Sequence, residues 1–390
     1  MVLLEYFLSL PAKLARITSG GAVIREIDGL RFLAIFPVVV QHLSERLERN
    51  TVIAFQQGYE FDISTFITNR GFIGVYIFFI ISGFILAKPF AAFRLKGGRK
   101  ISLKSYYVRR ITRLEPPYII VMIVISVALL VMGYFSWSEL YPHLAASIFY
   151  MHSIIYHSWS IINPPVWTLE IEVQFYIMAP FLALGIFAIK NKRVRRFGLI
   201  GVILILLLLQ DYFDVAHGYT VLTILAHIHY FIIGFLLVDI YLNEWENGII
   251  KRAYFNYLAI LSFVGAMVLW SWDHYLINRI LFALSLFILV YSVFRSTWVN
   301  RFFTLPWITA IGGMCYTIYL IHLPIIEFFI TYSKEIQVSN IFTINFIIQL
   351  LLLIPILLTF SIVFYLLIEK PCMHKDWPKQ LRAYVIAKVR

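Results

Sequence analysis

The residues best placed to do chemistry are ionisable side chains inside apolar segments. In the stretch REIDGLRFLAIFPVVVQHL, Asp28 and Arg31 come first, and His42 follows Arg31 by eleven residues, about 16 Å along a helix. A histidine accepts a proton near neutral pH, so His42 is a candidate general base or nucleophile. An interfacial or helix-bonded histidine is the plainer alternative. Charged groups inside a membrane are costly and mark functional sites, which favours the catalytic interpretation.

A later apolar segment, PPVWTLEIEVQFYIMAP, carries acidic residues at a similar depth. Glu172 lies five residues past the tryptophan, about 7 Å of helix, which is comparable with the depth of His42. A carboxylate at that depth needs a partner, so Glu172 is expected to orient His42, with Asp28 as the alternative acid. Further candidates are His322 in the middle of one apolar segment and Glu369 at the end of the last one.

An arginine cluster stands in SYYVRRITRLEPPY, where Arg109, Arg110 and Arg113 fall on neighbouring helical turns. Such clusters usually anchor the cytoplasmic side of a membrane protein. Arginine also binds phosphate groups bidentately. The cluster is therefore a candidate site for an anionic cytosolic ligand.

Other kinds of site lack their signatures. The sequence contains no HExxH metal motif, Walker loop, dinucleotide fingerprint or GxSxG serine elbow. His143, His152 and His157 are irregularly spaced and lack nearby acids, so no metal is expected. The net charge of +12 comes from basic residues in short connectors, which speaks against nucleic acid as a partner.

The composition predicts that these residues are held by membrane helices. Of the 390 residues 61% are hydrophobic and 14% charged, whereas a soluble domain is about 45–50% apolar and about 25% charged. Helices satisfy their own backbone groups and are the expected spanning form. The fold is therefore predicted to be all-α, with the lipid bilayer as its surroundings.

Loop charge sets the number of spans. The eleven hydropathy candidates are centred near Val38, Phe79, Val124, Ile148, Tyr176, Ile205, Phe231, Leu261, Leu286, Tyr319 and Pro355. Connectors 94–113 and 190–196 hold eight and five Lys or Arg, whereas 114–189 holds none. Because basic connectors stay in the cytoplasm, an even number of crossings separates them. The polar stretch 140–156 is therefore placed on the outer surface or as a re-entrant piece.

Ten spans remain, with both termini in the cytoplasm. Five of the 33 basic residues then lie outside, and these are Arg46, Arg49, Arg70, Arg279 and Lys334. The predicted organisation is an amphipathic lead-in over 1–26, a ten-helix domain over 27–371 and a basic cytoplasmic tail over 372–390. Close spacing of Gly71, Gly74 and Gly83 predicts tight helix packing.

Read in order, these blocks resemble the acyltransferase-3 family of polytopic membrane O-acyltransferases, the polysaccharide O-acetyltransferase type. The blocks that fit the family pattern are IDGL followed by an Arg and a His with ten residues between them, GVYIFFIISGF, YYVRRITRLEPPY, WTLEIEVQFY, CYTIYLIHLPI and IEKP. The similarity covers about 27–371. Tyr76, Thr168 and Cys315 depart from it. The first departure puts local packing or acceptor specificity in doubt, and none removes the Arg31 and His42 pair.

The resemblance implies acyl transfer in the bacterial cytoplasmic (inner) membrane by a multi-pass protein. Acyl-CoA, expected to be acetyl-CoA, is the implied donor, with its phosphates on Arg109, Arg110 and Arg113 and with Arg31 also on the donor side. A hydroxyl of a cell-surface glycan or related molecule is the implied acceptor, and a separate extracytoplasmic protein is needed if a second transfer step exists. His42 acts either as general base or through an acyl-histidine. The alternative function is a secondary transporter of a small anionic solute, but no paired halves are evident.

The charge argument predicts that residue 100 is cytoplasmic and residue 138 is not. Single cysteines in place of Lys100 and Ser138 should react with an impermeant maleimide from opposite sides of the membrane. Labelling of both from one side contradicts the topology.

Overall fold

The computed structural model describes residues 9–17, 23–51, 63–246, 248–270, 275–374 and 376–378. Every regular element in these ranges is helical, which confirms the all-α prediction. The helices are α2 (Arg25–Asn50), α3 (Ile63–Thr68), α4 (Ile73–Lys96), α5 (Leu103–Val131), α6 (Trp137–Ile148), α7 (His152–Tyr156), α8 (Trp167–Ile186), α9 (Lys192–Tyr212), α10 (Ile228–Ile240), α11 (Tyr254–Leu269), α12 (Leu276–Arg295), α13 (Trp298–Phe303), α14 (Pro306–Gly313), α15 (Cys315–Ser333), α16 (Phe342–Phe364) and α17 (Lys370–Cys372). Short helical turns are η1 (Pro164–Val166), η2 (Gly218–Leu222), η3 (Ile224–Ala226), η4 (Tyr241–Trp245) and η5 (Tyr365–Glu369).

Eight helical segments of the described chain are long and apolar enough to cross a membrane. They are Arg25–Asn50, Ser64–Lys96, Leu103–Val131, Pro164–Ile186, Ile228–Trp245, Leu276–Arg295, Cys315–Ser333 and Phe342–Cys372. The protein is therefore a multi-pass membrane protein.

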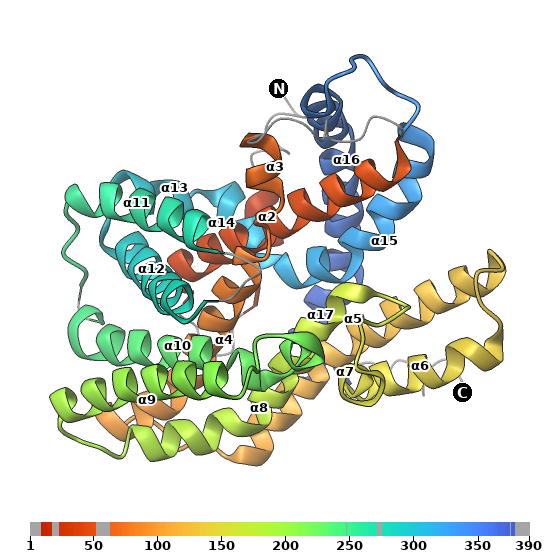
Figure 1. Cartoon of the computed structure of the whole chain (residues 1–390). Coiled ribbons are helices and arrows are strands. Elements are labelled where there is room, and N and C mark those ends of the chain that lie inside the picture. The colour runs from red at the N-terminus through yellow and green to blue at the C-terminus, as the bar shows by residue number, and fades with distance from the viewer. Residues whose placement is uncertain are drawn as a thin grey trace.

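The sequence count of ten differs from this count by two helices. The predicted spans near Ile205 and Leu261 are present as α9 and α11, which lie beside α10 and α12 (Figure 1). α9 begins with four basic residues among its first five, and α11 has only 16 residues, fewer than the ~20 that cross a bilayer. Length and composition alone therefore support eight spans.

The stretch 140–156, predicted to lie outside the membrane, forms only short helices. α6 has 12 residues and α7 has five, so neither is long enough to span. Figure 1 shows α6 folding back beside α5 after the turn that follows Val131.

The helix that carries His42, α2, packs closely against its neighbours. A Cβ on Gly74 of α4 would lie 1.9 Å from the carbonyl oxygen of Ala34 in α2. On the other side of α4, a Cβ on Gly83 would lie 2.1 Å from the carbonyl oxygen of Phe231 in α10. These contacts confirm the close packing predicted from the glycines, since any larger residue would force the helices apart.

Candidate active site

A cavity of about 310 Å³ lies among α2, α4, α5, α8, α15 and η5. Its lining includes six of the site residues predicted from the sequence, namely Arg31, His42, Arg110, Arg113, Glu172 and Glu369. The other three, Asp28, Arg109 and His322, do not line it. One space therefore joins the predicted base to most of the predicted charged groups.

The cavity follows α2 for most of its length. Its lining on this helix runs from Arg31 to Arg49. A step of 18 residues corresponds to about 27 Å of helix. The hydrocarbon core of a bilayer is about 30 Å thick. The cavity is therefore long enough to bring together ligands that arrive from opposite faces of the membrane.

His42 is held by a chain of hydrogen bonds on its own helix. Its Nδ1 lies 3.0 Å from Glu45 Oε2. Gln41 Nε2 donates to Glu45 Oε1 at 2.7 Å, and the backbone N–H of Phe72 donates to Gln41 Oε1 at 3.0 Å. An ionised carboxylate only accepts, so His42 donates from Nδ1 and its Nε2 carries the free lone pair. This is the tautomer that a general base at Nε2 needs.

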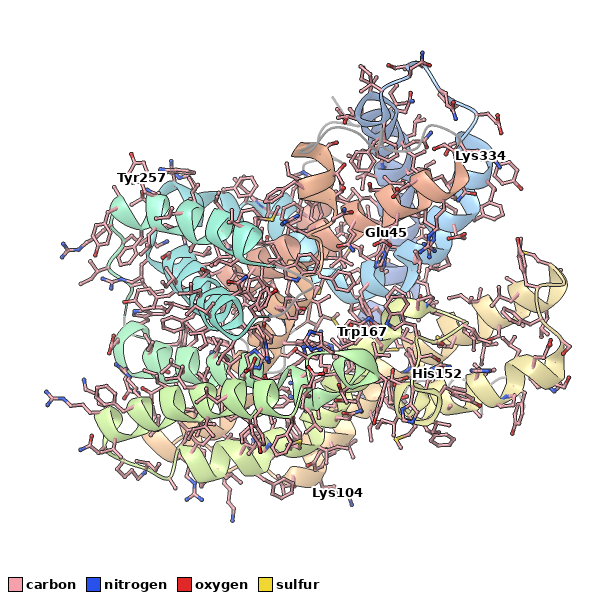
Figure 2. The ribbon with its side chains drawn as sticks, in the orientation of Figure 1. Glu45, Lys104, His152, Trp167, Tyr257 and Lys334 are labelled. Carbon is pink, nitrogen blue, oxygen red and sulfur yellow. The ribbon has the colours of Figure 1, made fainter. Side chains whose placement is uncertain are left out.

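Glu45 was missed in the sequence interpretation, which considered acids on other helical turns. The signal was its position three residues after His42, because side chains at i and i+3 meet on a helix surface. Figure 2 shows Glu45 where α2 runs beside α15.

Glu172 faces a different set of groups. It accepts a hydrogen bond from Ser82 Oγ and interacts electrostatically with Arg31 and Tyr176. No hydrogen bond joins it to His42 in the described part of the chain. Glu172 therefore shares the cavity with His42, but its observed partners are Ser82, Arg31 and Tyr176.

Asp28 is buried at the start of α2, where it pairs with two arginines. Arg16 Nε lies 2.7 Å and Arg31 Nη1 lies 3.1 Å from Asp28 Oδ1. The carboxylate precedes His42 by 14 residues, about 21 Å of helix. The structure therefore places Asp28 as a partner of Arg31, not as the acid that orients His42.

His322 lies next to His42 without lining the cavity. The two ring centroids are 5.3 Å apart, and His322 is fully buried. Its Nδ1 is 2.8 Å from the carbonyl oxygen of Tyr319 and 3.1 Å from that of Ile318. Carbonyls only accept, so Nδ1 carries the hydrogen, and Nε2 has no partner among the described residues. His322 thus supplies a second, neutral imidazole beside the candidate base.

The arginine cluster divides into two faces of α5. Arg110 and Arg113 line the cavity, and the Arg110 guanidinium lies 5.5 Å from the ring centroid of Tyr176. The Nε of Arg113 is buried without a hydrogen-bond partner among the described atoms. Arg109 is exposed and lies outside the cavity. A one-residue step rotates a helical side chain by about 100°, which separates Arg109 from its neighbour.

Glu369 closes the same end of the cavity. It lies in η5, a π-helical turn, and its buried carboxylate accepts hydrogen bonds from Thr317 N at 3.1 Å and Thr317 Oγ1 at 2.5 Å. It interacts electrostatically with Arg113 and Arg31. This end of the cavity therefore combines three arginines with two acids, Glu172 and Glu369.

Two histidines of α6 and α7 form a pair. His143 Nδ1 lies 2.8 Å from His152 Nε2, and burial lowers the pKa of both imidazoles. In the described ranges, no three His, Cys, Asp or Glu side chains come close enough to hold a metal ion.

The sequence matches a known protein family. A family model described as an acyltransferase domain matches residues 24–366. A protein of Staphylococcus aureus (strain COL), named provisionally as an O-acetyltransferase, is 26% identical over 344 residues, which cover 80% of this chain and 52% of the relative. The O-acetyltransferase OatA of S. aureus (strain NCTC 8325 / PS 47) is 23% identical over 334 residues, again 80% of this chain and 52% of the relative.

A third relative has a more specific name. The peptidoglycan O-acetyltransferase OatA of Listeria monocytogenes serovar 1/2a is 31% identical over 183 residues, 43% of this chain and 25% of that protein. The chain thus spans about half the length, or less, of these curated relatives. No solved structure matches it.

Proposed function

Since this chain belongs to the acyltransferase-3 family, we propose that it is an O-acyltransferase that moves an acetyl group from cytosolic acetyl-CoA to a hydroxyl of a cell-surface glycan. The observation that carries the proposal is the cavity along α2, in which His42 lies between arginines toward both ends. A secondary transporter, the alternative, has no support among the relatives.

The donor would enter at the end of the cavity that holds Arg31, Arg110 and Arg113. Arginines bind phosphate oxygens with charge-assisted hydrogen bonds, and Arg113 has a buried Nε still free for one. The thioester arm would then extend along α2 for the eleven residues to His42, about 16 Å. Glu172 and Glu369 would hold the arginines in place while this end is empty.

At His42, the acceptor hydroxyl would lose its proton to Nε2 as its oxygen attacks the thioester carbonyl carbon. The C–S bond of the resulting tetrahedral oxyanion would then break. The thiolate of CoA would leave and take the proton back from the imidazolium, giving an ester and free CoA. Glu45 would stabilise the imidazolium through Nδ1–H. Because one cavity would hold both substrates, direct transfer would need no acyl-histidine.

The cellular setting follows the sequence prediction. The multi-pass chain would lie in the bacterial cytoplasmic membrane, with residues 94–113 inside and the α6 and α7 segment outside. The glycan acceptor would be reached from the outer face. A separate extracytoplasmic transfer protein stays a prediction.

The donor site predicts a contrast between arginines. Replacing Arg110 and Arg113 together by Gln should weaken CoA binding by about tenfold or more, because charge-assisted bonds to phosphate are lost. Arg109→Gln is the matched control and should change the affinity for CoA little. Any small loss should disappear at high salt, which screens exposed charges. Calorimetry on the purified protein measures both. Equal losses in the control and the double variant contradict the assignment.

The base prediction concerns His42. A general base contributes about 10²–10⁴ in rate, so His42→Gln should lose that factor in acetyl transfer and still bind CoA. Transfer of labelled acetyl groups in proteoliposomes is the measurement. Near wild-type transfer by the Gln variant makes His42 a structural histidine, and His322 then becomes the next candidate base.

The orienting role of Glu45 gives a separate prediction. In Glu45→Gln the amide can donate to Nδ1 of His42, which traps the hydrogen on Nε2 and removes the base. We expect kcat to fall roughly 10²-fold or more, with the KM for acetyl-CoA nearly unchanged and partial rescue by Glu45→Asp. Glu48→Gln, on an exposed position of the same helix, is the control. Full activity in Glu45→Gln rules out the role.

A further inference from the structure

The part of the cavity beyond His42 along α2 is lined by Arg46 and Arg49, and Trp159, which follows α7, also lines the cavity. The two arginines belong to the last turns of α2, and the tryptophan precedes the Pro164–Val166 turn η1. We call these three residues the outer mouth. Nothing in the proposed donor site uses them.

Arg46 is fixed beside the reacting groups. It lies four residues after His42, one turn further along the same helix face, and its Nε pairs with the carboxylate of Glu327. It interacts electrostatically with Glu45 and His322. Its side chain is only 12% exposed, and an anion of a ligand would share the guanidinium with the Glu327 carboxylate, which is itself half exposed.

Arg49 is exposed and lines the cavity one turn further out. A basic residue near the C-terminus of a helix is stabilised by the helix dipole, which gives one reason for its presence. The helix dipole does not require Arg49 to line the cavity. Basic residues are otherwise scarce on the face predicted to be outside, where loops of membrane proteins carry few of them. Two of the five basic residues predicted to lie outside, Arg46 and Arg49, line the outer mouth.

Trp159 is 54% exposed although it lines the cavity. An indole presents a flat apolar surface, against which the C–H face of a sugar ring can pack. Tryptophan is also common at membrane interfaces, but its place in the same lining as the two arginines adds a reason beyond anchoring. A flat apolar surface beside guanidinium groups suits a ligand that is both cyclic and anionic.

We infer that the outer mouth binds the acceptor as an acidic carbohydrate, with Trp159 against a sugar ring and Arg46 and Arg49 on an anionic substituent. The inference rests on the proposed function and names the substrate class. Arg46 and Arg49 lie about 6 and 10 Å beyond His42 along α2. The acylated hydroxyl should therefore lie on the sugar that carries the anion or on the sugar next to it.

The test compares matched oligosaccharides on the full-length protein in nanodiscs. The probes are a hyaluronan tetrasaccharide, its carboxyl-reduced neutral form, and a phosphorylated mannose oligosaccharide as the phosphate arm. Calorimetry should show at least about tenfold tighter binding of one anionic probe than of the neutral one, the factor that one charge-assisted contact supplies. The anionic probe that binds more tightly identifies carboxylate or phosphate as the natural group.

Variants separate the contributions. Arg49→Gln should remove the preference for the anionic probe, and Trp159→Ala should weaken every probe. Lys334→Gln, also predicted outside but not part of the cavity lining, is the control and should bind as wild type does.

Equal affinity for anionic and neutral probes, or no binding of any probe, overturns the inference. So does an unchanged preference in Arg49→Gln. Cleavage of acetyl-CoA is followed in parallel. Loss of the charge preference with intact acetyl-CoA cleavage contradicts the acceptor class alone, whereas absence of cleavage with charge-selective binding contradicts the proposed transfer alone.

Discussion

The arrangement depends on one constraint, that α2 carries ionisable side chains through a region surrounded by lipid. A charged group facing hydrocarbon is costly, so the polar face of α2 has to be enclosed by other helices. Backbone contacts as close as the 1.9 Å that a Cβ on Gly74 would leave to Ala34 allow α4 to cover one side. α15 and α14 cover others. The cavity is the space that remains in front of the polar face, and α2 supplies several of the charged groups in its otherwise largely apolar lining.

Charge pairing keeps this face stable when no ligand is present. At one end Asp28 lies between Arg16 and Arg31, and at the other the Glu327 carboxylate pairs with Arg46. Between them, the Glu45 carboxylate accepts from both Gln41 and His42. Buried charges need partners of this kind, since an unpaired one costs several kcal/mol. Some atoms of these residues take no part in the pairing. One of them is Nε2 of His42, which is therefore available to accept a proton.

Sequence patterns could predict the residue types and their depth, but not the direction in which each side chain points. Depth follows from counting residues along a helix, and Arg31, His42 and Glu172, which the sequence placed by their depth, all line one cavity. Direction depends on helix rotation and on neighbours far away in the chain. This is why Arg109 was grouped with Arg110, and why Glu172 was matched with His42 although its hydroxyl partner is Ser82 on another helix. Glu45 needed no distant information, only the i+3 rule.

The position of His42 along α2 fits the difference in shape between the two proposed substrates. Eleven residues separate it from Arg31, and only four separate it from Arg46. The base is therefore about 16 Å from the nearest inner arginine on α2 but about 6 Å from the first outer one. A thin, unbranched thioester arm can extend through a long narrow passage, whereas a glycan chain cannot. With chemistry close to the predicted outer end, the proposed flexible donor would cross the membrane and the proposed bulky acceptor would stay outside, so no large opening through the bilayer would be needed.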